Sequence, residues 1–291
     1  MLEKIDLSKK MDKDTYKQVI GEQSERLGLL QRELRTAGIP VMIVFEGMGA
    51  AGKGTQINRL IQAMDPRGFE VFANSKATEE EQLRPFLWRF WTKTPADGRI
   101  AIFDRSWYRQ VTIERFDGQI KEKNLPEAFQ DILSFERQLD DGGMVIIKLF
   151  LYISQEEQKK RFKKLEDSKE TSWRVTKDDW RRNKEYGRYL EINEEMLQKT
   201  DTERAPWSII EATDKDYVAD RFEAALREKA APKPEVSEKP PVKEERYQNG
   251  VLSGVDLTKT LTKEEYKKEI DRLQKRLEFL HSEIYRLRIP V

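Results

Sequence analysis

Short apolar runs alternate with amphipathic stretches along the middle of the chain. Five runs predict strands, at Val41–Phe45, Phe69–Phe72, Ile100–Phe103, Val145–Ile153 and Trp207–Ile210. Helical spacing of apolar residues predicts helices over Lys53–Met64, Glu79–Trp91, Leu125–Leu139, Glu156–Leu165, Trp180–Gln198 and Tyr217–Glu228. Because the strands lack the alternation of a sheet with one wet face, we expect an α/β fold, a three-layer α/β/α sandwich around a parallel sheet.

The same pattern divides the chain into parts. Residues 1–40 are predicted to be a helical leader, and residues 41–229 an α/β domain. Residues 230–250 form a predicted linker, rich in proline and charge. A further helix is predicted over Lys263–Tyr285.

The leader and the C-terminal part are related by an internal repeat. Asp6-Leu-Ser-Lys returns as Asp256-Leu-Thr-Lys, and Ile39-Pro-Val returns as Ile289-Pro-Val. The offset is 250 throughout, and fourteen of thirty-six aligned residues are identical. The repeat predicts that residues 251–291 are the start of a second, truncated domain.

Composition restricts the chemistry that the chain can carry. The 291 residues include no cysteine and one histidine, His281. Thiol chemistry, Ser-His-Asp catalysis and multi-histidine metal sites are therefore excluded, and Mg²⁺ bound by oxygen ligands is the metal to expect. The net charge of +1 gives no general attraction to nucleic acid, and no apolar run is long enough to predict a membrane span.

A phosphate-binding loop follows the first predicted strand. Its pattern is Gly-x-x-x-x-Gly-Lys, and a helix follows directly. Glycines in such a loop let backbone amides approach phosphate oxygens, and a lysine adds a positive charge. The predicted phosphate- or nucleotide-binding residues are Gly47, Gly49, Ala50, Ala51, Gly52, Lys53, Gly54 and Thr55.

Two further features point to phosphoryl transfer. Asp104 ends the third predicted strand and is the predicted Mg²⁺ ligand, and Arg105 beside it is suited to neutralising a transferring phosphoryl group. Residues 159–188 carry twelve Lys or Arg against six Asp or Glu. We interpret this basic segment, within a region of about 156–200, as a helical lid that closes over a polyanion. Its aromatic residues Trp173 and Trp180 are expected to pack rather than to stack on a ligand.

These motifs together resemble the polyphosphate kinase 2 family. The quoted pieces are Phe45-Glu-Gly, Ala50-Ala-Gly-Lys-Gly54, Phe86-Leu-Trp-Arg89, Phe103-Asp-Arg-Ser-Trp-Tyr108, Glu157-Gln158, Arg161-Phe162, Ala205-Pro-Trp207, Glu211-Ala and Asp214-Lys215. The repeat resembles the tandem-domain members of that family, which phosphorylate AMP to ADP.

The resemblance implies a fold, a reaction and its partners. The fold is similar to that of P-loop kinases, with a helical lid. The reaction is Mg²⁺-dependent transfer of a phosphoryl group between inorganic polyphosphate and AMP or ADP, in the cytoplasm. Lys53, Asp104 and Arg105 become the expected catalytic residues, and the polyphosphate-binding lid residues are Arg161, Lys164, Arg174, Arg181 and Arg182. The expected partners are a second copy of the chain or a second domain of the family, with no nucleic acid and no membrane.

The chain departs from the family pattern in two places. Gly49 stands where the family loop has an aspartate, and Arg109-Gln110 follows Tyr108 where the family usually has Asn or Gly and then Arg. One alternative is therefore a catalytically degenerate half of a tandem enzyme. Another is an ATP-dependent nucleoside monophosphate kinase, which also uses a Gly-Lys-x-Thr-Gln loop.

Overall fold

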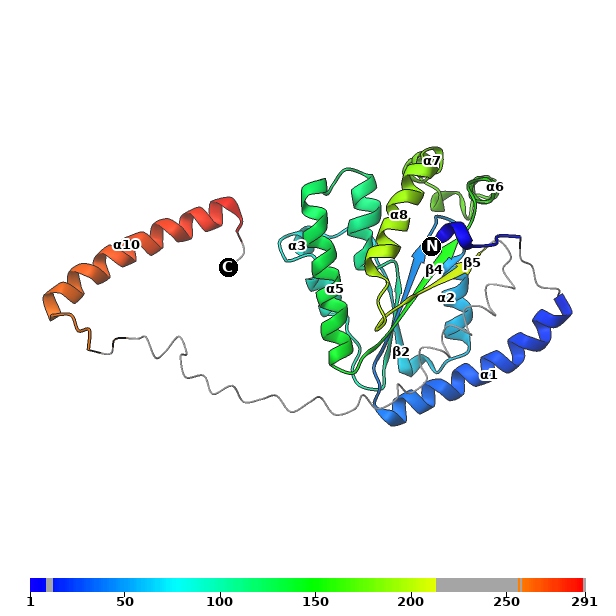
Figure 1. Ribbon diagram of the computed structural model, residues 1–291, viewed down its shortest axis with the longest axis horizontal. Coiled ribbons are helices and arrows are strands. Elements are labelled where there is room, and N and C mark those ends of the chain that lie inside the picture. The colour runs from blue at the N-terminus through cyan, green and yellow to red at the C-terminus, as the bar shows by residue number, and fades with distance from the viewer. Residues whose placement is uncertain (9–12, 213–255, 257, 290–291) are drawn as a thin grey trace. The chain divides into compact units, whose positions relative to one another are not determined.

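The computed structural model describes residues 1–8, 13–212, 256 and 258–289 (Figure 1). The chain divides into two compact units. Unit 1 comprises Met1–Glu81 and Pro85–Ala231, and the long helix α10 (Lys263–Leu287) belongs to unit 2. The predicted helix Tyr217–Glu228 and the predicted linker at 230–250 lie outside the described residues.

Unit 1 contains a parallel sheet of five strands in the order β2-β3-β1-β4-β5. The strands are β1 (Val41–Gly47), β2 (Phe69–Ala73), β3 (Ile100–Asp104), β4 (Val145–Tyr152) and β5 (Trp207–Glu211). All five predicted strands are therefore confirmed. The central strand β1 is buried along its whole length, which explains its uninterrupted apolar sequence.

Helices cover both faces of the sheet. The helices before α10 are α1 (Lys13–Ala37), α2 (Lys53–Gln62), α3 (Glu79–Gln82), α4 (Trp88–Trp91), α5 (Leu125–Asp141), α6 (Gln155–Glu166), α7 (Lys177–Lys184) and α8 (Tyr186–Thr200), of which α6 and α7 lie apart from the layers over the sheet. Short 3₁₀ or π turns are η1 (Leu2–Lys4), η2 (Pro66–Gly68), η3 (Trp107–Arg109), η4 (Gln110–Glu114), η5 (Glu122–Asn124) and η6 (Ser172–Arg174).

Alternate residues of β1 enter two separate cores. Ile43 and Phe45 pack with residues of α1 and α2, whereas Met42 and Val44 pack with residues of α5. This division follows from the period of two residues along a strand. Two apolar cores on opposite faces confirm the three-layer α/β/α sandwich.

Two predicted helices are interrupted. Pro85 separates α3 from α4 within the predicted helix Glu79–Trp91, because proline lacks an N–H and disfavours helical backbone before it. The predicted helix Trp180–Gln198 breaks at Glu185, which separates α7 from α8. Helix α8 buries seven of its residues, so it is part of the layer over the sheet, and the exposed helices of the basic segment are α6 and α7.

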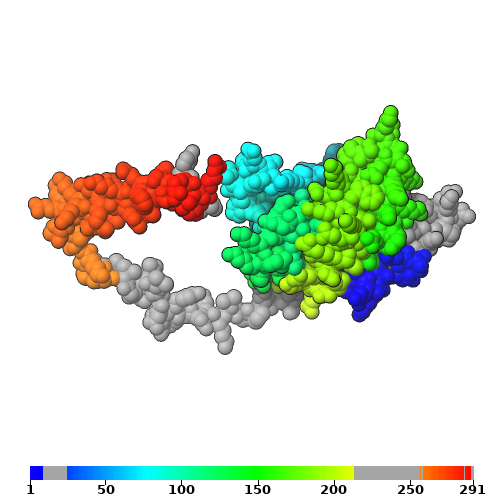
Figure 2. Space-filling model, turned by 90° about the horizontal axis from the view of Figure 1, so that it is seen from above, coloured from blue at the N-terminus to red at the C-terminus, as the bar shows by residue number. Residues whose placement is uncertain are grey.

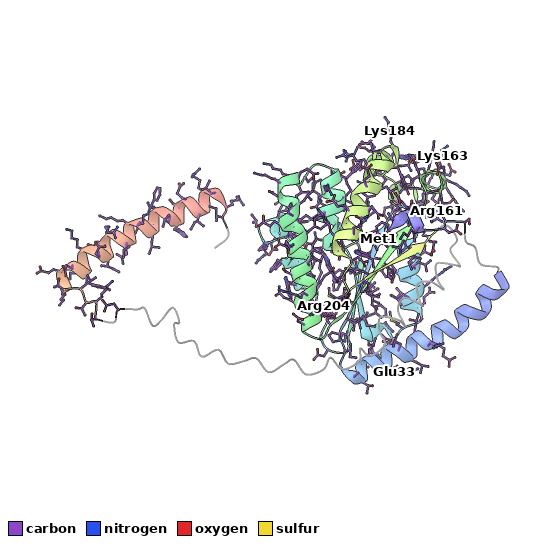
Figure 3. The ribbon with its side chains drawn as sticks, viewed as in Figure 1. Met1, Glu33, Arg161, Lys163, Lys184 and Arg204 are labelled. Carbon is purple, nitrogen blue, oxygen red and sulfur yellow. The ribbon has the colours of Figure 1, made fainter. Side chains whose placement is uncertain are left out.

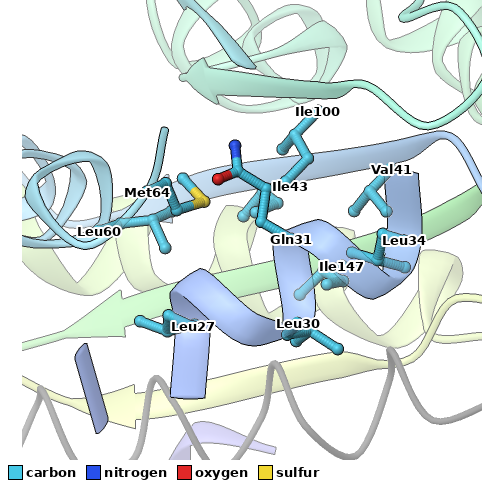
Figure 4. Close-up of a pocket in the computed structure, with 10 residues that line it drawn as sticks. All are labelled: Leu27, Leu30, Gln31, Leu34, Val41, Ile43, Leu60, Met64, Ile100 and Ile147. Atoms are coloured by element: carbon cyan, nitrogen blue, oxygen red, sulfur yellow. The ribbon is translucent and has the colours of Figure 1, made fainter. Parts of the chain in front are cut away.

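The leader helix α1 is part of unit 1 rather than a free extension. Leu34 is buried, and the Gln31 side-chain amide exchanges two hydrogen bonds with the backbone of Asp65, at 3.0 and 2.7 Å. An apolar cavity of about 20 Å³ lies between α1, α2 and the sheet (Figure 4). Since its walls are almost entirely aliphatic, we regard it as a packing gap and not as a binding site.

Helix α10 has an apolar stripe along one face, and most residues of this stripe are exposed. The stripe repeats at intervals of three and four residues, at Ile270, Leu273, Leu277, Leu280, Ile284 and Leu287. Leu277 is 64% exposed, although its repeat counterpart Leu27 packs against the core of unit 1. Among the described residues, no helix combines the length and the apolar character that crossing a membrane requires.

Candidate active site

The phosphate loop connects β1 to α2 with a left-handed backbone at three positions. Gly47 has φ +123° and Gly52 has φ +100°, and Ala50 has φ +56° although it is not glycine. A Cβ on Gly47 would lie 2.1 Å from the carbonyl oxygen of Leu151, so only glycine fits there. Ala50 adopts a conformation that costs an L-residue roughly 1–2 kcal/mol. The loop is therefore held in shape by contacts with its surroundings.

Lys53 begins α2 and turns back toward the loop. Its Nζ donates to the carbonyl oxygens of Gly47 at 3.2 Å and of Met48 at 2.9 Å, and the side chain is only 7% exposed. Ala51 is buried, whereas Gly54 and Thr55 lie exposed in the first turn of α2. The predicted order of strand, glycine loop and helix is present, with the ammonium group inside the loop.

The second predicted motif ends the neighbouring strand. Asp104 lies opposite Phe45 in the sheet, and the Arg105 N–H donates to the Phe45 carbonyl oxygen at 3.0 Å. Arg105 has φ +64°, a second strained position next to the loop. The structure thus brings Lys53, Asp104 and Arg105 together at the carboxyl ends of adjacent strands, where α/β proteins bind their ligands.

Asn74 is a residue of this site to which the sequence analysis gave no role. It follows β2, is 5% exposed, and donates from its N–H to the Asp104 carbonyl oxygen at 3.0 Å. Its side-chain Nδ2 donates to the Arg105 carbonyl oxygen at 2.6 Å, while its Oδ1 is buried without a hydrogen-bond partner. A polar residue directly after a predicted parallel strand was the signal for it.

Glu46 is a second such residue. It is 3% exposed, and one carboxylate oxygen accepts hydrogen bonds from the Ser106 N–H at 2.8 Å and the Ser106 hydroxyl at 2.9 Å. These bonds tie the end of β1 to the segment that follows Asp104. A charged residue in an otherwise apolar strand was the available signal.

Burial and charge shift the pKa values of these groups. Burial, followed by the neighbouring charge of Arg105, lowers the pKa of Lys53 to about 8, while the carboxylates of Asp104 and Glu46 oppose this. Burial raises the pKa of Glu46, against the influence of Arg105 and Lys53. For Arg105, burial is outweighed by attraction to nearby groups including Glu46, and its pKa is raised. A phosphate between Lys53 and Arg105 would relieve their mutual repulsion.

The residues present fit Mg²⁺ as a metal shared with a substrate. No group of three or more His, Cys, Asp or Glu side chains within the described ranges is placed to hold a metal ion. Mg²⁺ is commonly held by one or two carboxylates together with substrate phosphates and water. Asp104 offers a carboxylate at the end of β3, whereas Glu46 is already engaged by Ser106.

Helix α6 contacts the phosphate loop from outside. Arg161 donates to the Ala50 carbonyl oxygen at 3.1 Å, to the Ala212 carbonyl oxygen at 2.8 Å and to Glu157 at 2.7 Å. Gln158 donates from Nε2 to the Gly49 carbonyl oxygen at 3.0 Å. Arg161 was predicted to bind polyphosphate. In the structure its guanidinium bonds to the backbone of the loop and of Ala212, and polyphosphate binding stays a prediction.

The other predicted lid residues fall into two groups. Lys164 and Arg174 are exposed, and Arg181 is 45% exposed although it pairs with Asp117. Arg182 is 13% exposed between Asp117 and Asp179. The segment with α6 and α7 projects from unit 1 (green in Figure 2), and Arg161, Lys163 and Lys184 lie together at this end (Figure 3).

The two lid tryptophans differ. Trp180 packs edge-on against Phe162 at a centroid distance of 5.3 Å and donates to Glu166, as expected. Trp173 is 72% exposed, with the Arg174 guanidinium 5.3 Å from its ring centre. The expectation that Trp173 packs is therefore wrong: its indole N–H donates to the Glu170 carbonyl oxygen at 2.8 Å within the same exposed segment, and most of the ring stays exposed.

Comparisons with known proteins identify the family of this chain. The family model described as polyphosphate kinase 2 matches residues 10–231. The chain is 37% identical over 235 residues to a polyphosphate:AMP phosphotransferase from Pseudomonas aeruginosa, covering 78% of this chain and 47% of the relative. It is 33% identical to ADP-polyphosphate phosphotransferase 3 from Rhizobium meliloti, covering 69% and 70%. The crystal structure of polyphosphate kinase 2 from Arthrobacter aurescens superposes with a TM-score of 0.75 at 30% identity, covering 81% of this chain and 88% of that one.

The lengths of these relatives differ. The chain spans about half the length of the polyphosphate:AMP phosphotransferases that it matches, and most of the length of the structure from Arthrobacter aurescens. The matched region includes the whole sheet, the phosphate loop and both basic helices. On the family match and on these identities, this chain belongs to the polyphosphate kinase 2 family.

Proposed function

We propose that this chain transfers phosphoryl groups between inorganic polyphosphate and a nucleotide, with AMP to ADP favoured and ADP to ATP possible. The observation that carries the proposal is the meeting of buried Lys53 with the partly buried Asp104 and Arg105 at the phosphate loop. The names of the relatives, which include polyphosphate:AMP and AMP/ADP-polyphosphate phosphotransferases, support the substrate class. Nucleotide substrates also favour the cytoplasm as the place of action.

The reaction needs little covalent chemistry from the protein. A phosphate oxygen of AMP attacks the terminal phosphorus of polyphosphate, the bond to the bridging oxygen breaks, and the shortened polyphosphate leaves with that oxygen. Lys53 and Arg105 offset the negative charge of the transferring group, and the loop amides orient it. Mg²⁺ held by Asp104 would neutralise phosphate charge further.

The basic helices supply the second half of the site in this proposal. Lys164, Arg174 and Arg181 extend the positive surface beyond the loop, and a polyphosphate chain presents a row of negative charges to match it. Arg161 and Arg182 are assigned a supporting role, because their guanidinium groups already bind the loop and Asp117.

The exposed stripe of α10 is proposed to bind a second domain of the family. The support is the repeat: the counterparts Leu27, Leu30 and Leu34 in α1 pack on the sheet core of unit 1. Leu277 and Leu280 would make the same contacts with a second sheet. Light scattering of the purified chain, with and without a Leu277→Glu/Leu280→Glu change, measures self-association through this stripe.

The experiment for the activity uses the purified chain with Mg²⁺, long-chain polyphosphate and AMP or ADP, and quantifies new ADP or ATP. Lys53→Met and Arg105→Met serve as inactive references. Product that depends on polyphosphate and is lost in both variants supports the proposal. Product from ATP alone would instead identify a nucleoside monophosphate kinase. Binding of polyphosphate without turnover would identify a degenerate half, the alternative that Gly49 motivates.

A further inference from the structure

The buried side chain of Gln158 connects three elements at the phosphate loop. Its Nε2 donates to the Gly49 carbonyl oxygen at 3.0 Å, and its Oε1 accepts from Asn183 Nδ2 at 2.9 Å. Gln158 is 3% exposed and Asn183 is 5% exposed. Helix α6 thus contributes a single amide that links the loop to the end of α7.

The orientation of this amide is determined by its partners. The Gly49 carbonyl can only accept, so the nitrogen of Gln158 must face it. Asn183 Nδ2 also donates to the Gln155 carbonyl oxygen at 3.1 Å, and Gln155 Nε2 donates to the Asn183 carbonyl oxygen at 2.7 Å. These two bonds fix Asn183 against the first turn of α6, so its amide donor is held toward Gln158.

The position of the contact in the loop matters. Gly49 immediately precedes Ala50, whose φ of +56° is unfavourable for alanine. The carbonyls of these two consecutive residues accept from Gln158 and Arg161 respectively. Bonds to both carbonyls oppose rotation of the intervening backbone, and they keep the loop in the strained conformation in which its amides can face a phosphate.

We propose that Gln158 is a positioning residue that holds the phosphate loop in its strained, phosphate-ready conformation and couples it to α7 through Asn183. The proposal rests on the proposed function only in taking the loop as a phosphate site. Gln158 acts through Gly49 and Ala50 and need not touch the substrate.

The decisive variants are Gln158→Met, which keeps the side-chain length but removes both hydrogen bonds, and Ala50→Gly, which removes the strain. Binding of inorganic tripolyphosphate is measured by calorimetry. We expect Gln158→Met to weaken binding about tenfold, the loss typical of one or two buried hydrogen bonds. In the Ala50→Gly background the same change should cost only about twofold, because glycine adopts positive φ without support.

A graded comparison is Gln155→Met, which removes one of the two bonds that fix Asn183 but none to the loop; it should weaken tripolyphosphate binding less than Gln158→Met does. An equal loss from Gln158→Met in the alanine and glycine backgrounds would overturn the proposal. So would a Gln155→Met variant that is as weak as Gln158→Met.

A second measurement needs no ligand and no activity. Hydrogen exchange of the amides of residues 49–54 should be faster in Gln158→Met than in the parent, and slower again when Ala50→Gly is added. If amide exchange of residues 49–54 is unchanged in Gln158→Met, the positioning role of Gln158 is overturned, even if tripolyphosphate binding falls. If the parent fails to bind tripolyphosphate but the variants show this exchange pattern, the proposed function fails and the positioning role of Gln158 stands.

Discussion

The side-chain amide of Asn74 donates to the carbonyl oxygen of Arg105 at 2.6 Å and thereby supports the left-handed backbone of Arg105 at the end of β3. The bond joins the end of β2 to the end of β3, and a second bond between the Asn74 N–H and Asp104 runs beside it. Strained residues persist only where the surroundings determine them. Asn74 is therefore expected to set the direction of the Arg105 side chain.

Changing Asn74 to Asp should lower kcat by about tenfold or more with a smaller effect on KM, because an ionised carboxylate repels the Arg105 carbonyl. Steady-state assays with polyphosphate and AMP measure both constants. Ser75→Ala, at the exposed next position, is the control and should behave as the parent. Parental kcat in Asn74→Asp would show that Arg105 keeps its orientation without this bond.

The lowered pKa of Lys53 predicts a pH limit for phosphate binding. Below about pH 8 the ammonium group is charged and attracts phosphate, and above it the free protein loses this proton. Bound phosphate stabilises the charged form, so affinity for tripolyphosphate should fall as pH rises through 8, by up to about tenfold per pH unit. Calorimetry between pH 7 and pH 9.5 is the measurement, and Lys53→Met should give a weak, flat profile. An unchanged affinity across this range in the parent would separate Lys53 from the bound phosphate.

An aspartate at Gly49, where the family loop has this residue, would crowd its neighbours in the structure. Gly49 has no left-handed backbone, so aspartate is allowed there, but a Cβ would lie 3.3 Å from Phe162 and 3.4 Å from Gln158 Nε2. Gly49→Ala should therefore reduce activity modestly through crowding alone. The ratio of kcat in Gly49→Asp to kcat in Gly49→Ala isolates the effect of the carboxylate. A tenfold ratio corresponds to about 1.4 kcal/mol of transition-state stabilisation.

A ratio near one in an active parent would mean that this chain works without the second carboxylate. A large ratio with an almost inactive parent would support the degenerate half. Assays at saturating polyphosphate and AMP distinguish the two results.

Exposed cations of the basic segment should account for the salt dependence of polyphosphate use. Lys164→Ala with Arg174→Ala is expected to raise KM for polyphosphate several-fold and to flatten its dependence on salt, since exposed charges act through screened attraction. Arg204→Ala removes an exposed arginine that pairs with Asp140 at the opposite end of unit 1 (Figure 3) and should change neither quantity. If both variants shift KM equally, the effect is one of overall charge rather than of the lid.

A buried ion pair between β4 and α5 should matter mainly for stability. Lys148 Nζ, fully buried in β4, lies 2.9 Å from the Glu136 carboxylate, and Glu136 also accepts from Trp107 at 3.0 Å. Lys148→Met leaves that carboxylate without its cation and should lower the free energy of unfolding by about 3–5 kcal/mol. Urea denaturation followed by Trp fluorescence measures this.

Adding Glu136→Leu to Lys148→Met should recover part of the loss, because no charge then remains buried. A double variant less stable than Lys148→Met would mean that Glu136 contributes more through Trp107 and Tyr108 than through the lysine.

The chain alone determined the layered architecture and the main chemistry. Uninterrupted apolar runs such as Val41–Phe45 identified buried parallel strands, because only a strand covered on both faces lacks polar alternation. Gly47, Gly52 and Lys53 identified the loop for an equally local reason: positive φ and close backbone approach demand glycine at fixed spacing from the lysine. Both signals lie within a few residues of sequence.

Only the tertiary structure decided which charged and amide side chains serve the loop. Arg161, more than one hundred residues from Ala50 in the sequence, was predicted to bind polyphosphate, and the fold places its guanidinium within hydrogen-bonding distance of the Ala50 carbonyl oxygen. Local patterns placed Asn74 near a strand end and Gln158 in a family motif, but their bonding partners lie in separate strands and loops that only the fold brings side by side. Hydrogen bonds between residues so far apart in the sequence depend on which elements the fold brings together, and a local sequence pattern cannot predict that.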